Sequence, residues 1–158
     1  MNLLCFEYLD NYNYRRATHW IYSVWRKRGR RSMRQHDLYH GSKGDRILAI
    51  IQQGVMRPNN GVLFFGRFES QYPSLFQYGA DTARGACYVI KVRVHLPDGA
   101  ELKPHAREGA PIDSWTIEVP EPLTCQVLEL YVRPKGGEVL KVPATKIPSY
   151  LGQDRSKD

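Results

Sequence analysis

A histidine followed by glycine and serine, His40-Gly41-Ser42, is the group of residues in this chain best suited to binding a polar ligand. The residues before it, Asp37-Leu38-Tyr39, predict a short strand, so the histidine stands where a strand ends and a turn begins. A glycine at such a position lets another molecule approach the main chain closely. The backbone amide and carbonyl can then pair with a flat polar ligand, and the serine hydroxyl can bind a sugar hydroxyl.

The residues after this turn predict the elements that hold it in place. In residues 44–53, three isoleucines recur at helical spacing, and Gly54 stands where a helix is capped by glycine. Residues 58–61 form a turn cluster of Pro, Asn and Gly. Residues 61–66 predict a short, wholly apolar strand that is buried on both faces.

The second half of the chain predicts mostly strands. Residues 67–80 predict a short helix or an ordered loop, broken at Pro73. The clearest strand is 87–94, and a long loop rich in Pro, Gly and charge is expected over 95–114. Further strands are predicted at 115–119 and 126–132, with a terminal strand or hairpin near 139–142. Because helices are few and no strand–helix–strand repeat occurs, we expect an α+β fold with mainly antiparallel strands.

Charge divides the chain of 158 residues into parts. Residues 1–35 hold eight Lys and Arg against two acidic residues, whereas the remaining residues hold fifteen against fourteen. We therefore expect a basic aromatic N-terminal helical extension over 1–35 and one main domain over 36–150. Residues 151–158 predict a disordered tail.

Cysteine usage and hydropathy indicate the compartment. The three cysteines include no CxxC pair, so they suggest neither a disulfide framework nor a metal site. No apolar run is long enough to span a bilayer, and the first residues lack a basic leader and contain Glu7. We expect a cytoplasmic protein that binds no metal and no membrane.

The N-terminal extension combines cations with aromatic side chains. A helix is predicted over residues 13–28. The cations that cluster at and after its end are Arg26, Lys27, Arg28, Arg30, Arg31 and Arg34. Guanidinium groups bind phosphates in bidentate geometry, and the neighbouring Trp20, Tyr22 and Trp25 can stack on unpaired bases. The leading interpretation is a nucleic-acid contact; the alternatives are an acidic partner protein or a solvated linker.

Three motifs follow one another in the main domain. They are Leu38-Tyr39-His40-Gly41-Ser42, Ile51-Gln52-Gln53-Gly54-Val55 and Gly61-Val62-Leu63-Phe64-Phe65-Gly66. In this order they resemble the NAD-binding core of the poly(ADP-ribose) polymerase-like, or diphtheria-toxin-like, ADP-ribosyltransferases. The resemblance covers residues 38–94. It implies an ADP-ribosyltransferase-like fold, in which two packed, mainly antiparallel sheets surround an NAD cleft.

The resemblance also implies roles for the first two strands. His40 would hydrogen-bond the nicotinamide ribose, and the backbone of Gly41 would pair with the carboxamide. Ser42 would reach the adenosine side of NAD. Phe64 stands where the family often has a tyrosine, so the aromatic ring is kept while the hydroxyl is lost.

The segment after residue 66 would complete the cofactor site. By the resemblance, Tyr78, or else Tyr72, would stack on the nicotinamide, and Ser74 or Ser70 would hold its amide. The cofactor-binding residues implied in this way are Tyr39, His40, Gly41, Ser42, Phe64, Phe65, Ser74 and Tyr78.

The third motif of the family supplies a glutamate in a late strand. Cleavage of the N-glycosidic bond builds positive charge on the ribose, and a nearby carboxylate stabilises that state. Glu118, which precedes a proline-bounded turn and a further strand, is the candidate and would be catalytic together with His40. Glu129 is an alternative. In another register Gln126 takes the position, and the glutamate is then missing.

The resemblance implies a mono-ADP-ribosyltransferase of the small bacterial toxin or effector type, as in toxin–antitoxin or anti-phage systems. Such an enzyme transfers ADP-ribose from NAD, its co-substrate, to a macromolecule and releases nicotinamide. The basic extension makes nucleic acid the expected acceptor, RNA first and DNA second, and an antitoxin or inhibitor protein is a further expected partner. The alternatives are an NAD glycohydrolase, a protein-directed transferase, and a catalytically inactive module that binds NAD or nucleic acid.

Overall fold

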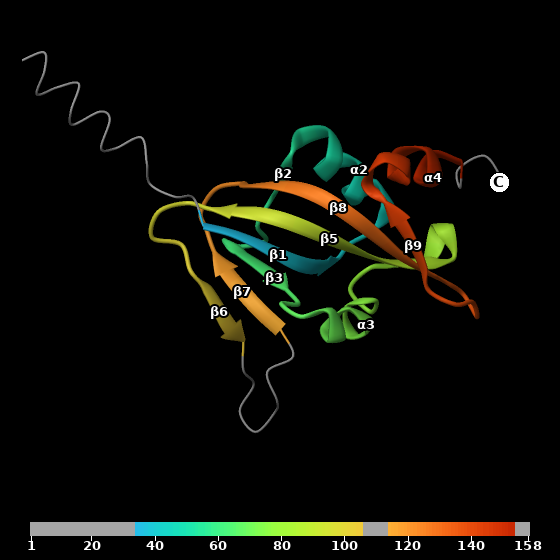
Figure 1. The fold of residues 1–158 in the computed structure, drawn as a ribbon, viewed down its shortest axis with the longest axis horizontal. Coiled ribbons are helices and arrows are strands. Elements are labelled where there is room, and N and C mark those ends of the chain that lie inside the picture. The colour runs from blue at the N-terminus through green and yellow to red at the C-terminus, as the bar shows by residue number, and fades with distance from the viewer. Residues whose placement is uncertain (1–33, 106–113, 154–158) are drawn as a thin grey trace, which may run out of the picture. The chain divides into compact units, whose positions relative to one another are not determined.

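Two antiparallel sheets form the framework of the main domain (Figure 1). The computed structural model describes residues 34–105 and 114–153. The larger sheet has the order β1-β5-β8-β2, with β4 beside β5 and β9 beside β8, and it curls into a half-barrel. Its strands are β1 (Arg34–Gly41), β2 (Val55–Met56), β4 (Ala80–Asp81), β5 (Ala86–Leu96), β8 (Leu123–Pro134) and β9 (Leu140–Pro143).

The smaller sheet has three strands. They are β3 (Val62–Phe65), β7 (Ser114–Glu118) and β6 (Leu102–His105), in that order. Every pairing between the described strands is antiparallel. The predicted α+β architecture with mainly antiparallel strands is therefore confirmed.

Helices are few and short in the described part of the chain. The longest, α2 (Gly44–Gln53), ends as predicted, because Gly54 takes a left-handed φ of 66° and donates its N–H to the Ile50 carbonyl over 2.8 Å. The others are α3 (Tyr72–Leu75) and α4 (Ile147–Gln153), with 3₁₀ turns η1 (Glu69–Gln71), η2 (Thr82–Arg84) and η3 (Ala144–Lys146). The helix predicted over 13–28 lies outside the described residues.

The two faces of the larger sheet carry different clusters. The main cluster joins residues of β1, β5 and β8 to the inner side of the smaller sheet and to α2 and α4. A second cluster, on the opposite face, consists of Tyr39, Val89 and Tyr131 with Leu75 and Phe76 of the α3 segment. Because neighbouring residues of a strand point to opposite faces, Leu38 and His40 face the main core whereas Tyr39 faces α3.

Two predictions about the middle of the chain were wrong. The strand predicted over 61–66 is not buried on both faces, since Phe64 is 49% exposed on its outer side. Pro73 does not break its segment but is the second residue of α3, where its missing N–H has no helical partner to lose.

The later part of the chain is also more regular than predicted. The segment 95–114, expected to be a loop, contains β6, and β5 continues to Leu96. Helix α4 extends to Gln153 with Leu151 fully buried, so residues 151–153 belong to the folded domain and not to a tail. None of the helices in the described ranges is long and apolar enough to cross a membrane.

A buried ionic cluster holds the turn between β1 and α2. The Gly44 N–H donates to the Asp81 carboxylate over 3.1 Å, and Arg84 lies 3.6 Å from that carboxylate. The Arg84 side chain is 7% exposed and also donates to Asp45 at 3.0 Å and to the Leu151 carbonyl at 2.6 Å. The side chains of Arg84 and Asp81 are both buried, whereas that of Asp45 is exposed, so removal of Arg84 or Asp81 should cost about 3–5 kcal/mol. The cluster therefore fixes the turn after β1 and ties it to α4.

Candidate functional site

The end of β1 is joined to the end of β3 by a single backbone bridge. The N–H of Tyr39 donates to the Gly66 carbonyl, and the N–H of Gly66 donates to the Tyr39 carbonyl, both over 2.8 Å. One residue beyond the bridge, a side chain makes the connection: Nδ1 of His40 lies 2.8 Å from the Phe64 carbonyl oxygen. Because a carbonyl oxygen only accepts, Nδ1 carries the proton, and Nε2 of the neutral ring keeps its lone pair.

The backbone of Gly41 faces away from β5. In an antiparallel pair, residues that bond to the partner strand alternate with residues that face outward. The N–H of Ser42 donates to the Tyr88 carbonyl over 3.3 Å, so Ser42 bonds toward β5, whereas Tyr39 bonds outward toward β3. Gly41, two residues after Tyr39, therefore has its N–H and C=O on the outer edge of β1. A donor and an acceptor stand side by side on an edge that β5 does not cover.

The segment after α3 packs closely over Gly41. A Cβ on Gly41 would collide with the Leu75 carbonyl oxygen and would lie 3.0 Å from the Cβ of Tyr78. Glycine is therefore needed at position 41 because the protein's own chain packs against it, and not only so that a ligand can approach the backbone there. Tyr78 itself is 62% exposed and its Cβ lies close to Gly41, so its ring is accessible to a ligand in this region.

Other predicted binding residues are tied into the fold. Ser42 is only 4% exposed, and Phe65 is fully buried with its ring 5.6 Å from that of His40. Tyr39 is buried in the cluster under α3. Ser42 therefore has little surface to offer a ligand.

The structure also separates the two tyrosines that were candidates for stacking. Tyr72 stacks on Tyr131, with ring centroids 4.5 Å apart, whereas Tyr78 is exposed. The hydroxyl of Ser74 donates to the Gln71 carbonyl over 2.8 Å. Tyr78 is therefore the ring that a ligand can reach.

The environment of His40 favours its neutral form. Burial lowers the pKa of His40, the Phe64 carbonyl opposes this by accepting its hydrogen bond, and the positive charge of Arg46 lowers the pKa further. The net direction is below the ordinary value of 6.5. Near neutral pH the ring can therefore accept a hydrogen bond at Nε2.

This pKa shift predicts a pH dependence of stability. Because the folded-state pKa is lowered, the unfolded chain binds the proton first as pH falls, so the free energy of unfolding decreases from about pH 6.5 down through the folded-state pKa. We expect urea denaturation to show this decrease in the wild type and a smaller one in His40→Gln, whose amide can still donate to Phe64 but does not titrate. Equal slopes in the two proteins would contradict the assignment.

Glu118 lies on the outer face of the smaller sheet. It pairs with Val62, and two residues earlier Thr116 pairs with Phe64. Residues two apart in a strand share a face, so the side chains of Glu118, Thr116 and Phe64 point the same way. Glu118 is exposed and, at about 3.3 Å per residue, lies about 7 Å along β7 from the position opposite Phe64. The Glu118 carboxylate therefore lies on the face of the Phe64 ring, whereas His40 faces the core beside Phe65 and reaches β3 at the Phe64 carbonyl.

Glu129, the alternative carboxylate, lies on the other side of the larger sheet. It pairs with Lys91, which pairs with Tyr39, so it shares the face of Tyr39 and not that of His40. Burial raises the pKa of Glu129, but hydrogen bonds from Lys141 at 3.1 Å and from the Tyr131 hydroxyl at 2.9 Å outweigh it and lower the pKa. The Glu129 carboxylate is therefore already engaged by Lys141 and Tyr131.

Comparison of the chain with protein-family models, with curated proteins and with solved structures gave no match.

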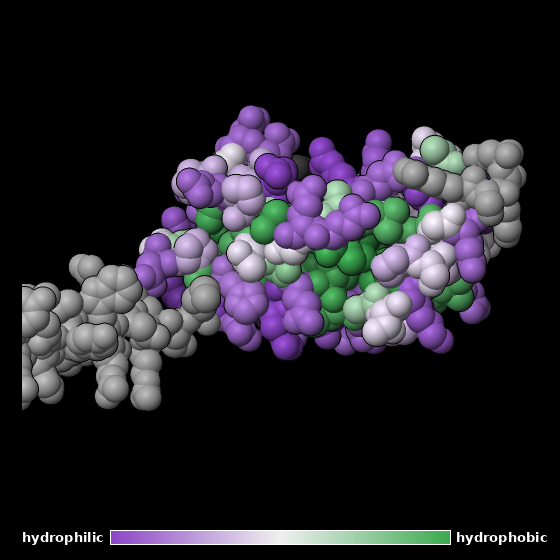
Figure 2. Space-filling model, turned by 90° about the horizontal axis from the view of Figure 1, so that it is seen from above, coloured by the Kyte–Doolittle hydropathy of each residue, from purple (hydrophilic) through white to green (hydrophobic). Residues whose placement is uncertain are grey.

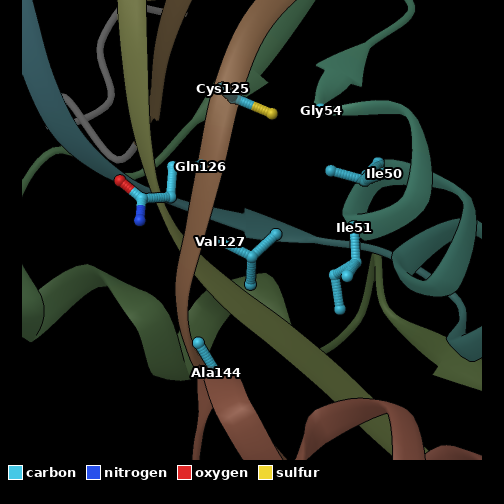
Figure 3. A pocket seen from close by; sticks show the side chains of 7 residues that line it. All are labelled: Ile50, Ile51, Gly54, Cys125, Gln126, Val127 and Ala144. Carbon is cyan, nitrogen blue, oxygen red and sulfur yellow. The ribbon is translucent and has the colours of Figure 1, made fainter.

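A hollow of about 180 Å³ lies between α2 and β8 (Figure 3). It is lined by Ile50, Ile51, Gly54, Cys125, Gln126, Val127 and Ala144. Cys125 and Val127 point toward α2, whereas Gln126 points away from it. Figure 2, which looks onto the side with α2, β8 and α4, shows apolar side chains gathered between hydrophilic ones. Burial raises the pKa of the Cys125 thiol to about 11, so this cysteine is a poor nucleophile near neutral pH.

Of the six cations of the N-terminal basic cluster, the structure describes only Arg34. Arg34 begins β1, is exposed, and donates to the Ala100 carbonyl over 3.1 Å. Arg26, Lys27, Arg28, Arg30 and Arg31 lie outside the described residues. Within the described ranges, no three His, Cys, Asp or Glu side chains are grouped so that they could hold a metal ion.

Sequence reasoning missed three contributions to the site. Gly66 closes the bridge to β1, and the pair Asp81 and Arg84 holds the turn after Gly41. His105, expected to be a loop residue, ends β6 and contacts the Phe64 ring. The three-residue spacing of Asp81 and Arg84 is a weak sequence signal for an ion pair. The contact of His105 depends on strand pairing and leaves no local signal.

Proposed function

We propose that this chain is a mono-ADP-ribosyltransferase that uses NAD and has an ADP-ribosyltransferase-like fold. The observation that carries the proposal is the pair of outward-facing backbone groups of Gly41, next to the hydrogen bond between His40 and Phe64. A primary carboxamide has one N–H cis to its C=O, so it presents a donor and an acceptor to the same side, as a single residue of a neighbouring strand does. It can therefore pair with a strand edge as another strand would.

The proposed placement of NAD follows from this pairing. The nicotinamide carboxamide would lie on the Gly41 edge, and the exposed ring of Tyr78 would stack on the pyridine. The lone pair at Nε2 of His40 would accept a hydrogen bond from a hydroxyl of the nicotinamide ribose. These contacts orient the glycosidic bond before it breaks.

In the proposed reaction, the bond between the ribose anomeric carbon and the nicotinamide nitrogen breaks, and its electron pair leaves with nicotinamide. The carboxylate of Glu118 would stabilise the positive charge that develops on the ribose. The acceptor then forms the new bond to that carbon and gives its proton to Glu118 or to solvent. The substitution is balanced without an oxidant or reductant.

The proposed acceptor is nucleic acid, RNA before DNA. The net charge of +7 and the cations of residues 26–34 support a polyanionic acceptor. A basic effector of this kind, like a toxin of a toxin–antitoxin pair, would require an inhibitor protein in the cell that makes it.

Incubation of the full chain with NAD labelled in its adenosine part, together with RNA, DNA or protein, tests the proposal. We expect label on RNA, a loss of about a hundredfold or more in His40→Ala, and retention in His36→Ala, a control with the same residue type in the same strand. Free ADP-ribose alone would indicate a glycohydrolase, label on protein a protein-directed transferase, and NAD binding without turnover an inactive module. Failure to bind NAD in calorimetry would refute the proposal.

A further inference from the structure

The outer face of the smaller sheet carries an exposed aromatic pair. Phe64, in the middle of β3, meets His105 of β6 edge to face, with ring centroids 5.3 Å apart. Thr116 of β7 lies opposite Phe64, and Lys103 of β6 pairs with Thr116. Phe64 is 49% exposed, so part of its ring is open to solvent and can be reached by a flat partner.

The ring and the main chain of Phe64 face different directions. Its carbonyl accepts from His40 and therefore points toward β1, in the plane of the sheet. Its side chain stands perpendicular to that plane and reaches across Thr116 to His105, away from β1. The backbone of Phe64 thus belongs to the His40 connection, whereas its ring is left for another contact.

We propose that this outer face, with Phe64 and His105 at its centre, binds an unpaired nucleobase of a single-stranded nucleic acid acceptor. The proposal rests on the proposed function and names the place where the acceptor is held. Aromatic rings exposed on a sheet stack on bases in single strands, and every base has a face for such stacking.

The chemistry of the face favours a nucleic acid over a protein partner. The apolar surface is small, the Phe64 ring with the partly buried Val62, and its neighbours on the face are the polar Thr116, the cation Lys103 and, opposite Val62, Glu118. Such a mixed face suits a base and its phosphate better than an apolar interface core. Most of the net charge of +7 lies in residues 1–35, so on this face it is Lys103 that can contact a phosphate.

The position of Glu118 connects this face to the proposed chemistry. Glu118 shares the face with Thr116 and Phe64 and lies about 7 Å along β7 from the stacking position. A base stacked on Phe64 would hold its own nucleotide beside the carboxylate that is proposed to stabilise the ribose. Acceptor and ribose would thus meet at Glu118, on the outer face of the smaller sheet.

The test measures binding of a fluorescent single-stranded RNA of about 12 nucleotides by the full chain without NAD, in parallel with single-stranded DNA and an RNA duplex. We expect single strands to bind more tightly than the duplex. Phe64→Ala should weaken single-strand binding about ten- to a hundredfold, and Phe64→Tyr should restore it. Leu140→Ala is the matched control, because Leu140 is 48% exposed, close to the 49% of Phe64, and should leave binding unchanged.

The outcomes separate this proposal from the proposed function. Unchanged RNA affinity in Phe64→Ala, or equal loss in Leu140→Ala, would overturn the assignment of this face, even if NAD is bound and turned over. Binding of a duplex as tight as that of a single strand would do the same, because stacking on a duplex base is blocked. If NAD binding fails while Phe64-dependent RNA binding persists, the base-binding face stands and the transferase proposal falls.

Discussion

Glu118→Gln should abolish transfer of ADP-ribose while NAD remains bound. The amide keeps the size of the carboxylate but not its charge, so stabilisation of the positive ribose is lost only as the glycosidic bond breaks. Removal of one such preorganised group lowers kcat about a hundred- to a thousandfold. We therefore expect loss of label on the acceptor, with the NAD dissociation constant in calorimetry changed less than about threefold.

Glu121→Gln is the control for this prediction. Glu121 is also exposed and lies three residues after Glu118, beyond the end of β7. Its substitution therefore removes the same charge at a position that does not face β3. It should retain full transfer. Undiminished transfer in Glu118→Gln would show that this carboxylate is not the one that acts on the ribose. Glu129→Gln should also stay active, because its side chain faces the opposite side of the larger sheet.

Gly41→Ala should strongly destabilise the domain. The added methyl group would collide with the Leu75 carbonyl oxygen, and it would lie 3.0 Å from the Tyr78 Cβ and 3.1 Å from the Gly79 nitrogen. Two of these three atoms are backbone, which cannot rotate away. Overpacking of this kind costs about 3 kcal/mol, so we expect the free energy of unfolding from urea denaturation to fall by about that amount.

A second glycine offers the matched control. Gly152 lies in α4, and a Cβ there would meet no atom within 4 Å. Gly152→Ala should therefore raise stability by about 0.5–1 kcal/mol, because alanine loses less backbone entropy in a helix. If Gly41→Ala were as stable as the wild type, the segment 75–79 could not lie as close to β1 as described, and the exposed Tyr78 would lose its place beside the Gly41 edge.

Features that depend on near neighbours in the chain could be predicted from the sequence. The isoleucine spacing and the cap at Gly54 predicted α2, and alternation predicted the strand at 87–94, which the structure extends to Ala86–Leu96. Hydrophobic periodicity and a glycine cap act over one or two turns, so they are visible in any short window. The resemblance to ADP-ribosyltransferases likewise rests on such local motifs and remains a prediction.

Contacts between distant segments were decided by tertiary structure. The sequence could rank Glu118 above Glu129 only by the residues that flank each glutamate in the chain. Strand pairing puts the two carboxylates on different sheets, and Glu129 lies on the face opposite to that of His40. The same holds for Phe64, which looked like a residue of a fully buried strand and became half exposed because nothing described covers the outer face of β3.

His40-Gly41-Ser42 shows both sides of this division. The sequence by itself determined a strand end with a histidine and a glycine, where a backbone edge could meet a ligand. Only the tertiary structure decided that Tyr39 bonds to Gly66, that His40 donates to Phe64, and that Gly41 has its polar groups on the edge away from β5. The physical reason is that residue types limit what each backbone group can do, whereas the register between strands far apart in the chain decides which groups are paired.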